Sequence, residues 1–257
     1  MVEIFYIPGL NTYGDGQIHV GPFRFGQMHS QISQALLKHD VRLVCYDNLA
    51  YGTIDEHVDR ILKSNNQFKP NTILAHSTGG LIARALAHHT EFTAGIKRII
   101  TIATPHAGTP LAERALHLTE QKRLLSTVTR MFGYNIKEKL KFFEELTPQA
   151  LKKFNKLYPD KDSITYYSIA TAPKVSDLEL PFRLLQSLAG LKFDSVERFD
   201  GIIPYESQKW GVPLGNFELD HLAQIGFFRH IVSKRKRNSA RLQFEQMMSL
   251  VGTLVKS

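Results

Sequence analysis

A serine between an apolar run and a helix-like pattern constrains this chain more than any other feature. The run ends at Ile73-Leu74, the stretch Ala75-His76-Ser77-Thr78-Gly79 follows, and apolar residues then recur with helical spacing from Leu81. Small residues thus stand two positions before and after Ser77, as in the pattern Gly-x-Ser-x-Gly with alanine in the first glycine position. This spacing is typical of a strand–turn–helix elbow that strains the serine backbone and exposes its hydroxyl. An ordinary turn of small residues would leave the same trace, so the rest of the chain has to support the elbow.

Strand-like and helix-like segments alternate on both sides of the elbow. Apolar runs predict strands at residues 2–7, 41–46, 96–103 and 163–171 and at the run that ends at Ile73-Leu74, and helical spacing predicts helices at about 25–39 and 54–62. Such alternation predicts an α/β fold with a mostly parallel central sheet and helices on both faces. We expect one domain over residues 1–257, with the functional site at the carboxyl ends of the strands, where Ser77 lies.

The middle of the chain changes character. From about residue 107 to 160 the pattern is helical and no strand is evident, which predicts an inserted helical cap above the sheet. A second apolar stretch, at about 174–194, is a candidate second cap element. A cap would exclude water and line an apolar trough. The alternative is a helical insertion that completes the core.

Composition and charge limit the function classes. The chain has a formal net charge of +8 and one cysteine, Cys45, which cannot form an internal disulfide. No signal peptide or membrane-spanning stretch is evident, so cytoplasmic localisation is the default expectation, and a leaderless export route would leave no mark. The basic run Lys234–Arg237 reads as solvated surface near a helix end, with anionic lipid as an alternative partner. Nucleic acid is not an expected partner, because no reading motif accompanies the run.

A nucleophilic serine needs a histidine to take its proton and a carboxylate to orient that histidine. In chains with this elbow the order is serine, acid, histidine. Asp200 stands on a turn beside Gly201, and His221 follows a polar loop. The sequence therefore predicts Ser77, Asp200 and His221 as catalytic residues.

Other residues compete for these roles. Asp194 lacks the turn context, and Asp220 adjoins His221, so its side chain should point the opposite way. His106 follows a predicted strand, and a substrate contact and a structural role are equally compatible with its position. His76 should project away from Ser77, and His230, beside a predicted surface arginine, is expected at the surface.

Two backbone amides are expected to bind the oxyanion of the reaction. One is the N–H of Thr78 at the start of the helix, where the helix dipole helps. The other should come from the loop after the first strand, which points to the N–H of Leu10, next to Gly9. Glycine at position 9 allows close approach of the backbone to the substrate.

The chain resembles the bacterial true lipases, the triacylglycerol lipases of the α/β-hydrolase fold. The segments that carry the resemblance are Pro8-Gly9-Leu10, residues 75–80, Thr104-Pro105-His106-Ala107-Gly108, residues 145–159, Asp200–Pro204 with Ser207–Gly211, and Leu219-Asp220-His221. The resemblance implies the α/β-hydrolase fold, the triad Ser77, Asp200 and His221, and oxyanion amides at Leu10 and Thr78.

The sequence also departs from that family. Pro8 replaces the histidine before the oxyanion glycine, and Ala223 replaces the aspartate that ligates calcium two residues after the histidine. We therefore expect no cofactor or metal. The predicted function is hydrolysis of carboxylic esters of lipid-like substrates through an acyl-enzyme on Ser77. An acyltransferase, phospholipase or thioesterase would use the same residues, and a non-catalytic binding protein would keep the fold alone.

Overall fold

The computed structural model describes most of the chain, and every structural statement below concerns the described part. It covers residues 1–9, 18–20, 23–25, 28–46, 52–64, 69–89, 92, 94–120, 136–174, 177–178, 182–183, 187, 198–228 and 230–257.

Six parallel strands form the central sheet of the described chain. They are β1 (Val2–Ile7), β4 (Val41–Cys45), β5 (Thr72–His76), β6 (Arg98–Ile102), β7 (Thr165–Thr171) and β8 (Val212–Phe217), in the order β4-β1-β5-β6-β7-β8. Every neighbouring pair is parallel. From β1 the chain crosses first to β4 on one side and then to β5 on the other. The strand order therefore reverses between β1 and β5, and a crevice opens at such a switch point, beyond the carboxyl ends.

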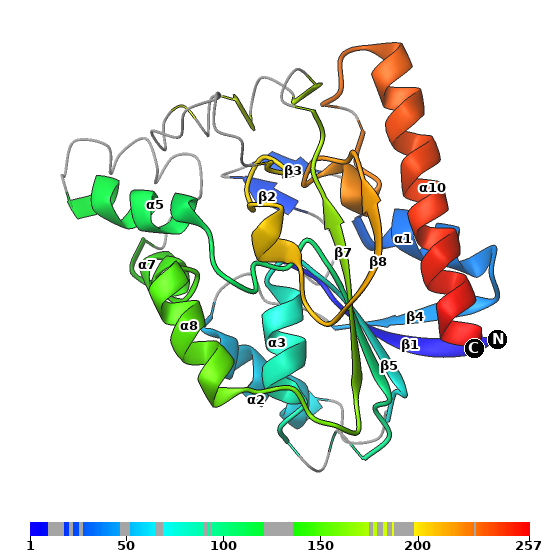
Figure 1. Ribbon diagram of the computed structural model, residues 1–257, viewed down its shortest axis with the longest axis horizontal. Coiled ribbons are helices and arrows are strands. Elements are labelled where there is room, and N and C mark those ends of the chain that lie inside the picture. The colour runs from blue at the N-terminus through cyan, green and yellow to red at the C-terminus, as the bar shows by residue number, and fades with distance from the viewer. Residues whose placement is uncertain are drawn as a thin grey trace.

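Helices cover both faces of this sheet (Figure 1). On one face lie α1 (Met28–Leu37) and α10 (Lys234–Lys256), and on the other lie α2 (Ile54–Ser64) and α3 (Gly79–Leu86). The period of two along β1 divides its side chains between the two cores, because Ile4 and Tyr6 pack with α1 and α10, while Phe5 and Ile7 pack with α2 and α3. The predicted α/β architecture with helices on both faces is confirmed.

Helices also fill the described chain between β6 and β7. They are α5 (Pro110–Glu120), α7 (Ile136–Glu145) and α8 (Pro148–Leu157). Thr147 caps α8 by accepting a hydrogen bond from the Ala150 N–H, and Pro148 opens its first turn. Phe142, Leu146 and Leu151 are buried in the core beside α2 and α3. These side chains of α7, α8 and the turn between them therefore complete the core, the alternative that the sequence left open, and a cap over the site stays a prediction.

Several elements were not predicted. A hairpin of two three-residue strands, β2 (Ile18–Val20) and β3 (Phe23–Phe25), precedes α1, and β3 ends where the helix at about 25–39 was predicted to start. Strand β8 contains Pro213 and Gly215 and stands at the sheet edge, where proline is tolerated. Two 3-10 turns, η2 (Glu206–Gln208) and η3 (Ala223–Ile225), flank it in the chain. The second cap element falls on 174–194, most of which lies outside the described residues. No helix in the described ranges combines the length and apolar character needed to cross a bilayer.

Candidate active site

The predicted elbow is present at the end of β5. Ser77 has a φ of +53°, in the left-handed region that non-glycine residues rarely adopt. Two hydrogen bonds hold it there: the Ser77 N–H donates to the Ile102 carbonyl at 2.8 Å, and the Thr104 hydroxyl donates to the Ser77 carbonyl at 2.7 Å. A Cβ at Gly79 would lie 2.3 Å from the Ile7 carbonyl oxygen, so glycine is required for α3 to pack against β1. The neighbours of Ser77 are thus small for the steric reason that the pattern predicted.

The end of β1 touches the elbow. A Cβ added to Gly9 would lie 2.8 Å from the Ser77 Cβ, so the backbone of this loop runs directly beside the serine. Leu10, the predicted oxyanion donor, lies outside the described residues. Thr78 is the N-cap of α3. Its N–H has no acceptor among the described residues. The oxyanion roles of Thr78 and Leu10 remain predictions.

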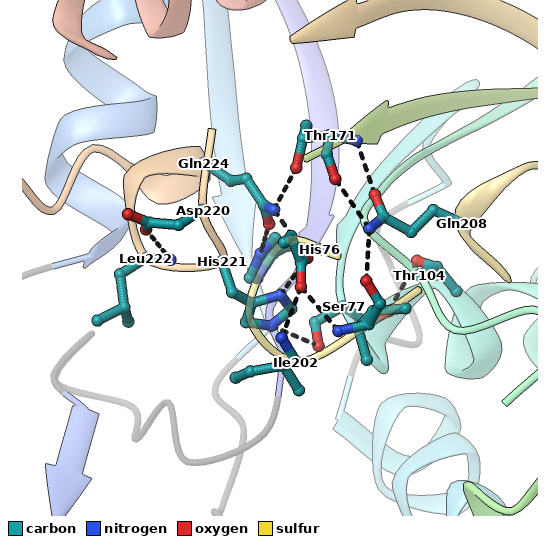
Figure 2. Close-up of polar contacts among 12 residues, drawn as sticks. His76, Ser77, Thr104, Thr171, Ile202, Gln208, Asp220, His221, Leu222 and Gln224 are labelled. Atoms are coloured by element: carbon teal, nitrogen blue, oxygen red, sulfur yellow. Dashed lines mark hydrogen bonds and ion pairs between the residues drawn. The ribbon is translucent and has the colours of Figure 1, made fainter. Parts of the chain in front are cut away.

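Two successive hydrogen-bond distances join the three predicted catalytic side chains, and Figure 2 shows Ser77 beside His221. The Ser77 Oγ lies 3.1 Å from the His221 Nε2, and the His221 Nδ1 lies 2.7 Å from the Asp200 Oδ2. All three residues are buried, Asp200 completely. The fold thus brings together a hydroxyl, an imidazole and a carboxylate that are distant in the sequence, in the order that proton transfer from the serine requires.

A tight turn fixes the carboxylate. The Asp200 Oδ1 accepts hydrogen bonds from the N–H groups of Ile202 at 2.9 Å and Ile203 at 2.7 Å. Gly201 has a φ of +105°, which explains why glycine follows the aspartate. The His221 N–H also donates to the Asp200 carbonyl at 2.8 Å, so the acid loop and the histidine loop are joined through their backbones.

Two buried glutamines attach these loops to Thr171 at the end of β7 (Figure 2). The Gln208 amide accepts from the Thr171 N–H and donates to the carbonyls of Thr171 and Ile203. The Gln224 Nε2 donates to the Thr171 hydroxyl and, at 2.9 Å, to the Asp200 Oδ2. Neither glutamine was singled out from the sequence, because a glutamine in a loop has no pattern that reveals a buried partner.

His76, beside the serine, belongs to the same network. Its Nε2 lies 2.9 Å from the Gln224 Oε1, and its ring centroid lies 4.9 Å from that of His221. Burial, together with the nearby charge that His221 can carry, lowers the pKa of His76 to about 3. His76 is therefore neutral at physiological pH. Its side chain projects away from the Ser77 hydroxyl, as expected, but it contacts the histidine that approaches that hydroxyl.

The contacts of His106 indicate a structural role. Its ring stacks on Trp210 with centroids 5.2 Å apart, and its two nitrogens lie 3.2 Å from the Thr101 hydroxyl and 3.4 Å from an Arg84 nitrogen. Arg84, itself buried, lies over Trp210 and donates to Asn155 of α8 at 2.7 Å. Burial and the Arg84 charge lower the pKa of His106 well below its ordinary value. His106 thus helps to connect α3, α8 and the Trp210 segment, the second of the two roles that its position allowed.

The structure also bears on the two other aspartates considered as the acid and on the histidine expected at the surface. Asp194 lies outside the described residues. Asp220 does not pair with His221: its Oδ1 accepts from the N–H groups of Leu222 and Ala223, and its Oδ2 lies 2.7 Å from the His230 Nε2. The expectation that His230 lies at the surface is wrong, because its side chain is only 9% exposed and packs between Phe182 and Phe227.

The residues around position 223 do not fit the calcium site that the resemblance implies. Ala223 is buried and offers no side-chain oxygen, and both carboxylate oxygens of Asp220 are already engaged. Within the described ranges no cluster of three histidine, cysteine or acidic side chains is placed to hold a metal ion.

Comparisons with known proteins find distant similarities in sequence. A family model for the PGAP1-like alpha/beta domain matches residues 47–165. Triacylglycerol lipase 2 of Saccharomyces cerevisiae is 26% identical over 180 residues, which are 68% of this chain and 51% of that protein. The chain thus spans about half the length of this curated relative.

Solved structures show the same fold. The lipase of Staphylococcus hyicus superposes with a TM-score of 0.67 at 14% identity, covering 99% of this chain and 95% of that one. The mature lipase BlEst2 of Bacillus licheniformis gives a TM-score of 0.61 at 14% identity, covering 96% and 91%. The chain therefore has the α/β-hydrolase fold. In sequence it is similar, at a distance, to the PGAP1-like alpha/beta domain and to the yeast lipase.

Proposed function

We propose that this protein is a serine ester hydrolase of the lipase and esterase type, which cleaves carboxylic esters of lipid-like substrates through an acyl-enzyme on Ser77. The observation that carries the proposal is the chain of contacts from the Ser77 Oγ to the His221 Nε2 and from the His221 Nδ1 to the Asp200 Oδ2, at 3.1 and 2.7 Å. The strained elbow supports it, because an unusual φ at a buried serine is retained where geometry matters for function.

The proposed reaction has two stages, formation of the acyl-enzyme and its hydrolysis. The Ser77 Oγ attacks the ester carbonyl carbon while its proton passes to the His221 Nε2, and Asp200 stabilises the imidazolium that forms. The N–H groups of Thr78 and Leu10 bind the oxyanion. The tetrahedral intermediate collapses and expels the alcohol, which takes the proton from His221. Water then attacks the acyl-enzyme, gives a proton to His221, and the acid leaves as Ser77 regains that proton.

Relatives favour a lipid-like ester as the substrate. The yeast relative is named a triacylglycerol lipase, and the two solved structures compared above are named lipases.

Replacing the serine tests the proposal. We expect Ser77→Ala to abolish hydrolysis of p-nitrophenyl esters and labelling by a fluorophosphonate, because both need the Ser77 oxygen. Ser207→Ala is a matched control, since Ser207 is also buried and hydroxyl-bearing but donates to the Gly108 carbonyl. It should keep its label and most of its activity.

The assay also separates the alternatives. Persistent activity and labelling in Ser77→Ala would contradict the assignment, and a folded wild type that resists the probe would favour a binding protein. Added alcohol distinguishes an acyltransferase, which would form the new ester in preference to the free acid. Thioester and phospholipid substrates, assayed in parallel with product identification, test for a thioesterase or a phospholipase.

The proposal includes peripheral contact with an anionic lipid surface at the start of α10. Lys234 and Arg235 are exposed there, as are Val232 at 82% and Leu242 at 61%. The sequence from His221 to Phe244 contains six Lys or Arg residues and no Asp or Glu. Cations at a helix N-terminus oppose the helix dipole, so this run does not serve helix stability. Cationic side chains beside exposed apolar ones suit a membrane of anionic lipids.

In Figure 1, α10 begins at the top, at the end toward which β7 runs. We expect Lys234→Glu with Arg235→Glu to weaken co-sedimentation with phosphatidylglycerol vesicles about 10-fold or more, at about 1 kcal/mol per cation. Lys152→Glu with Lys153→Glu, the same charge change at exposed positions of α8, is the control. Equal binding by both double variants would contradict the assignment of this surface.

A further inference from the structure

We propose that Gln224 and His76 are positioning residues, which together hold the Asp200 carboxylate in the orientation that His221 requires. This inference rests on the proposed function and deepens it. Figure 2 shows the contacts: the Gln224 side chain lies between His76, Thr171 and the acid loop. Gln224 is completely buried and His76 is 5% exposed, so water has little access to these contacts.

The carboxylate fixes the direction of the Gln224 amide. An ionised carboxylate only accepts hydrogen bonds, so the group 2.9 Å from the Asp200 Oδ2 must be the NH2 of Gln224. The second proton of the same NH2 is donated to the Thr171 hydroxyl. The amide carbonyl is left to face His76.

The amide in turn fixes the tautomer of His76. A carbonyl oxygen can only accept, so the His76 Nε2, 2.9 Å away, must carry the proton. Burial keeps His76 neutral, as its lowered pKa of about 3 indicates. A neutral histidine has one N–H, and here that N–H is committed to Gln224. The direction of every donor is thus determined from Asp200 outward.

The arrangement gives the carboxylate four donors. Its Oδ1 accepts from two backbone N–H groups of the turn, and its Oδ2 accepts from His221 and from Gln224. The backbone pair alone fixes one oxygen, whereas the Gln224 amide sets the second oxygen opposite the His221 Nδ1. The His76 ring also packs against the ring of His221, so it limits movement of the same imidazole.

A purely structural explanation does not account for these residue types. Buried amides and imidazoles lose their hydration, and an apolar pair of similar volume would fill the space without that cost. Polar groups that break this local preference concentrate at functional sites. The Gln224 amide faces the Asp200 carboxylate, Thr171 at the end of β7, and His76, which packs against the ring of His221.

Matched variants test the proposal. Gln224→Met keeps the volume and removes the donor to Asp200, and we expect kcat to fall about 10- to 100-fold with KM within about 3-fold. His76→Leu removes the N–H that fixes the amide and should also lower kcat about 10-fold. His76→Gln places an amide N–H near the former Nε2, so it should recover at least about a third of wild-type kcat.

A spectroscopic measurement separates positioning from general stability. The proton between the His221 Nδ1 and Asp200 should give a downfield proton NMR signal in the wild type and in His76→Gln. We expect Gln224→Met to shift or broaden it while thermal unfolding remains cooperative. If Gln224→Met does not fold, the His76 pair carries the same test.

The outcomes are distinct. Wild-type kcat and an unchanged downfield signal in Gln224→Met would overturn the inference, and so would equal losses of kcat in His76→Leu and His76→Gln. An inactive wild type would instead refute the proposed function, and the NMR signal would then still report whether Gln224 orders the Asp200–His221 pair.

Discussion

Asp200→Asn should lower kcat for ester hydrolysis by roughly 10⁴-fold while leaving the fold intact, which is the scale known for this change in a Ser-His-Asp protease. The backbone N–H groups of Ile202 and Ile203 require an oxygen at the Oδ1 position. The new NH2 must therefore take the Oδ2 position, where it meets two further donors, the His221 Nδ1–H and the Gln224 NH2.

Donors cannot bind donors, so the imidazole must change tautomer. With its proton moved to Nε2, His221 can no longer accept the proton of Ser77, 3.1 Å away. The Gln224 amide would also have to rotate, which would turn its NH2 toward the His76 N–H. The loss of activity thus follows from proton positions and needs no change in packing.

Asp220→Asn is the matched control. Asp220 precedes His221 and is buried, but its carboxylate binds the Leu222 and Ala223 N–H groups and His230. An asparagine keeps the oxygen for the two N–H groups, and its NH2 can donate to the His230 Nε2 when the ring carries its proton on Nδ1. We expect kcat within about 10-fold of wild type. If Asp220→Asn lost as much activity as Asp200→Asn, the choice of acid would be wrong.

Acidification from pH 7.5 to 5 should remove several kcal/mol of folding free energy. His57, His76 and His106 are buried, and burial lowers the pKa of His57 to about 4, that of His76 to about 3 and that of His106 well below its ordinary value. Below about pH 6.5 these histidines bind protons in the unfolded chain but stay unprotonated in the folded chain. The free energy of unfolding therefore falls as the pH falls.

The size of the loss in folding free energy follows from the pH range over which the histidines are protonated only in the unfolded chain. A histidine whose folded pKa lies below 5 loses about 2 kcal/mol of stabilisation between pH 6.5 and 5, at about 1.4 kcal/mol per pH unit. His57 and His76 together contribute about 4 kcal/mol, and His106 adds to this in the same direction, so the total is a large part of the whole stability of many domains. Glu145 acts in the opposite sense, because burial raises its pKa to about 7 and acidification relieves its charge. This half-buried, partly screened carboxylate should restore only about 1 kcal/mol.

Urea unfolding at pH 7.5, 6.5, 5.5 and 5 measures this dependence. His57→Phe is the informative variant. His57 belongs to α2 and packs against Tyr46, away from the candidate site. The variant should lose about a third less free energy between pH 7.5 and 5 than the wild type does. A wild-type stability that changed by less than about 1 kcal/mol over this range would show that the three histidines are not protected from protonation.

The sequence predicted those features that depend on local chemistry or on periodicity. The elbow at Ser77 was predictable, because its backbone excludes large neighbours at Ala75 and Gly79. Asp200 was recognisable from the turn with Gly201, and the alternation along β1 reflects burial on both faces. These patterns are written within a few residues, so they can be read without knowledge of the rest of the fold.

Features that arise from tertiary contacts were not predictable. Gln208 and Gln224 meet at Thr171 only because β7 ends between the acid and histidine loops. The burial of His230 depends on Phe182, which is 48 positions away in the chain. Strand β8 was missed because its residues are half exposed at a sheet edge and include proline and glycine, so neither periodicity nor composition marks it as a strand.

A hydrogen bond joins the turns that follow β5 and β6, and this has a practical consequence for protein engineering. A residue with positive φ follows each strand, +53° at Ser77 and +50° at Ala103, and the Thr104 hydroxyl donates to the Ser77 carbonyl. Libraries that vary position 103 or 104 will therefore displace the nucleophile, and most members should be inactive for reasons unrelated to substrate fit.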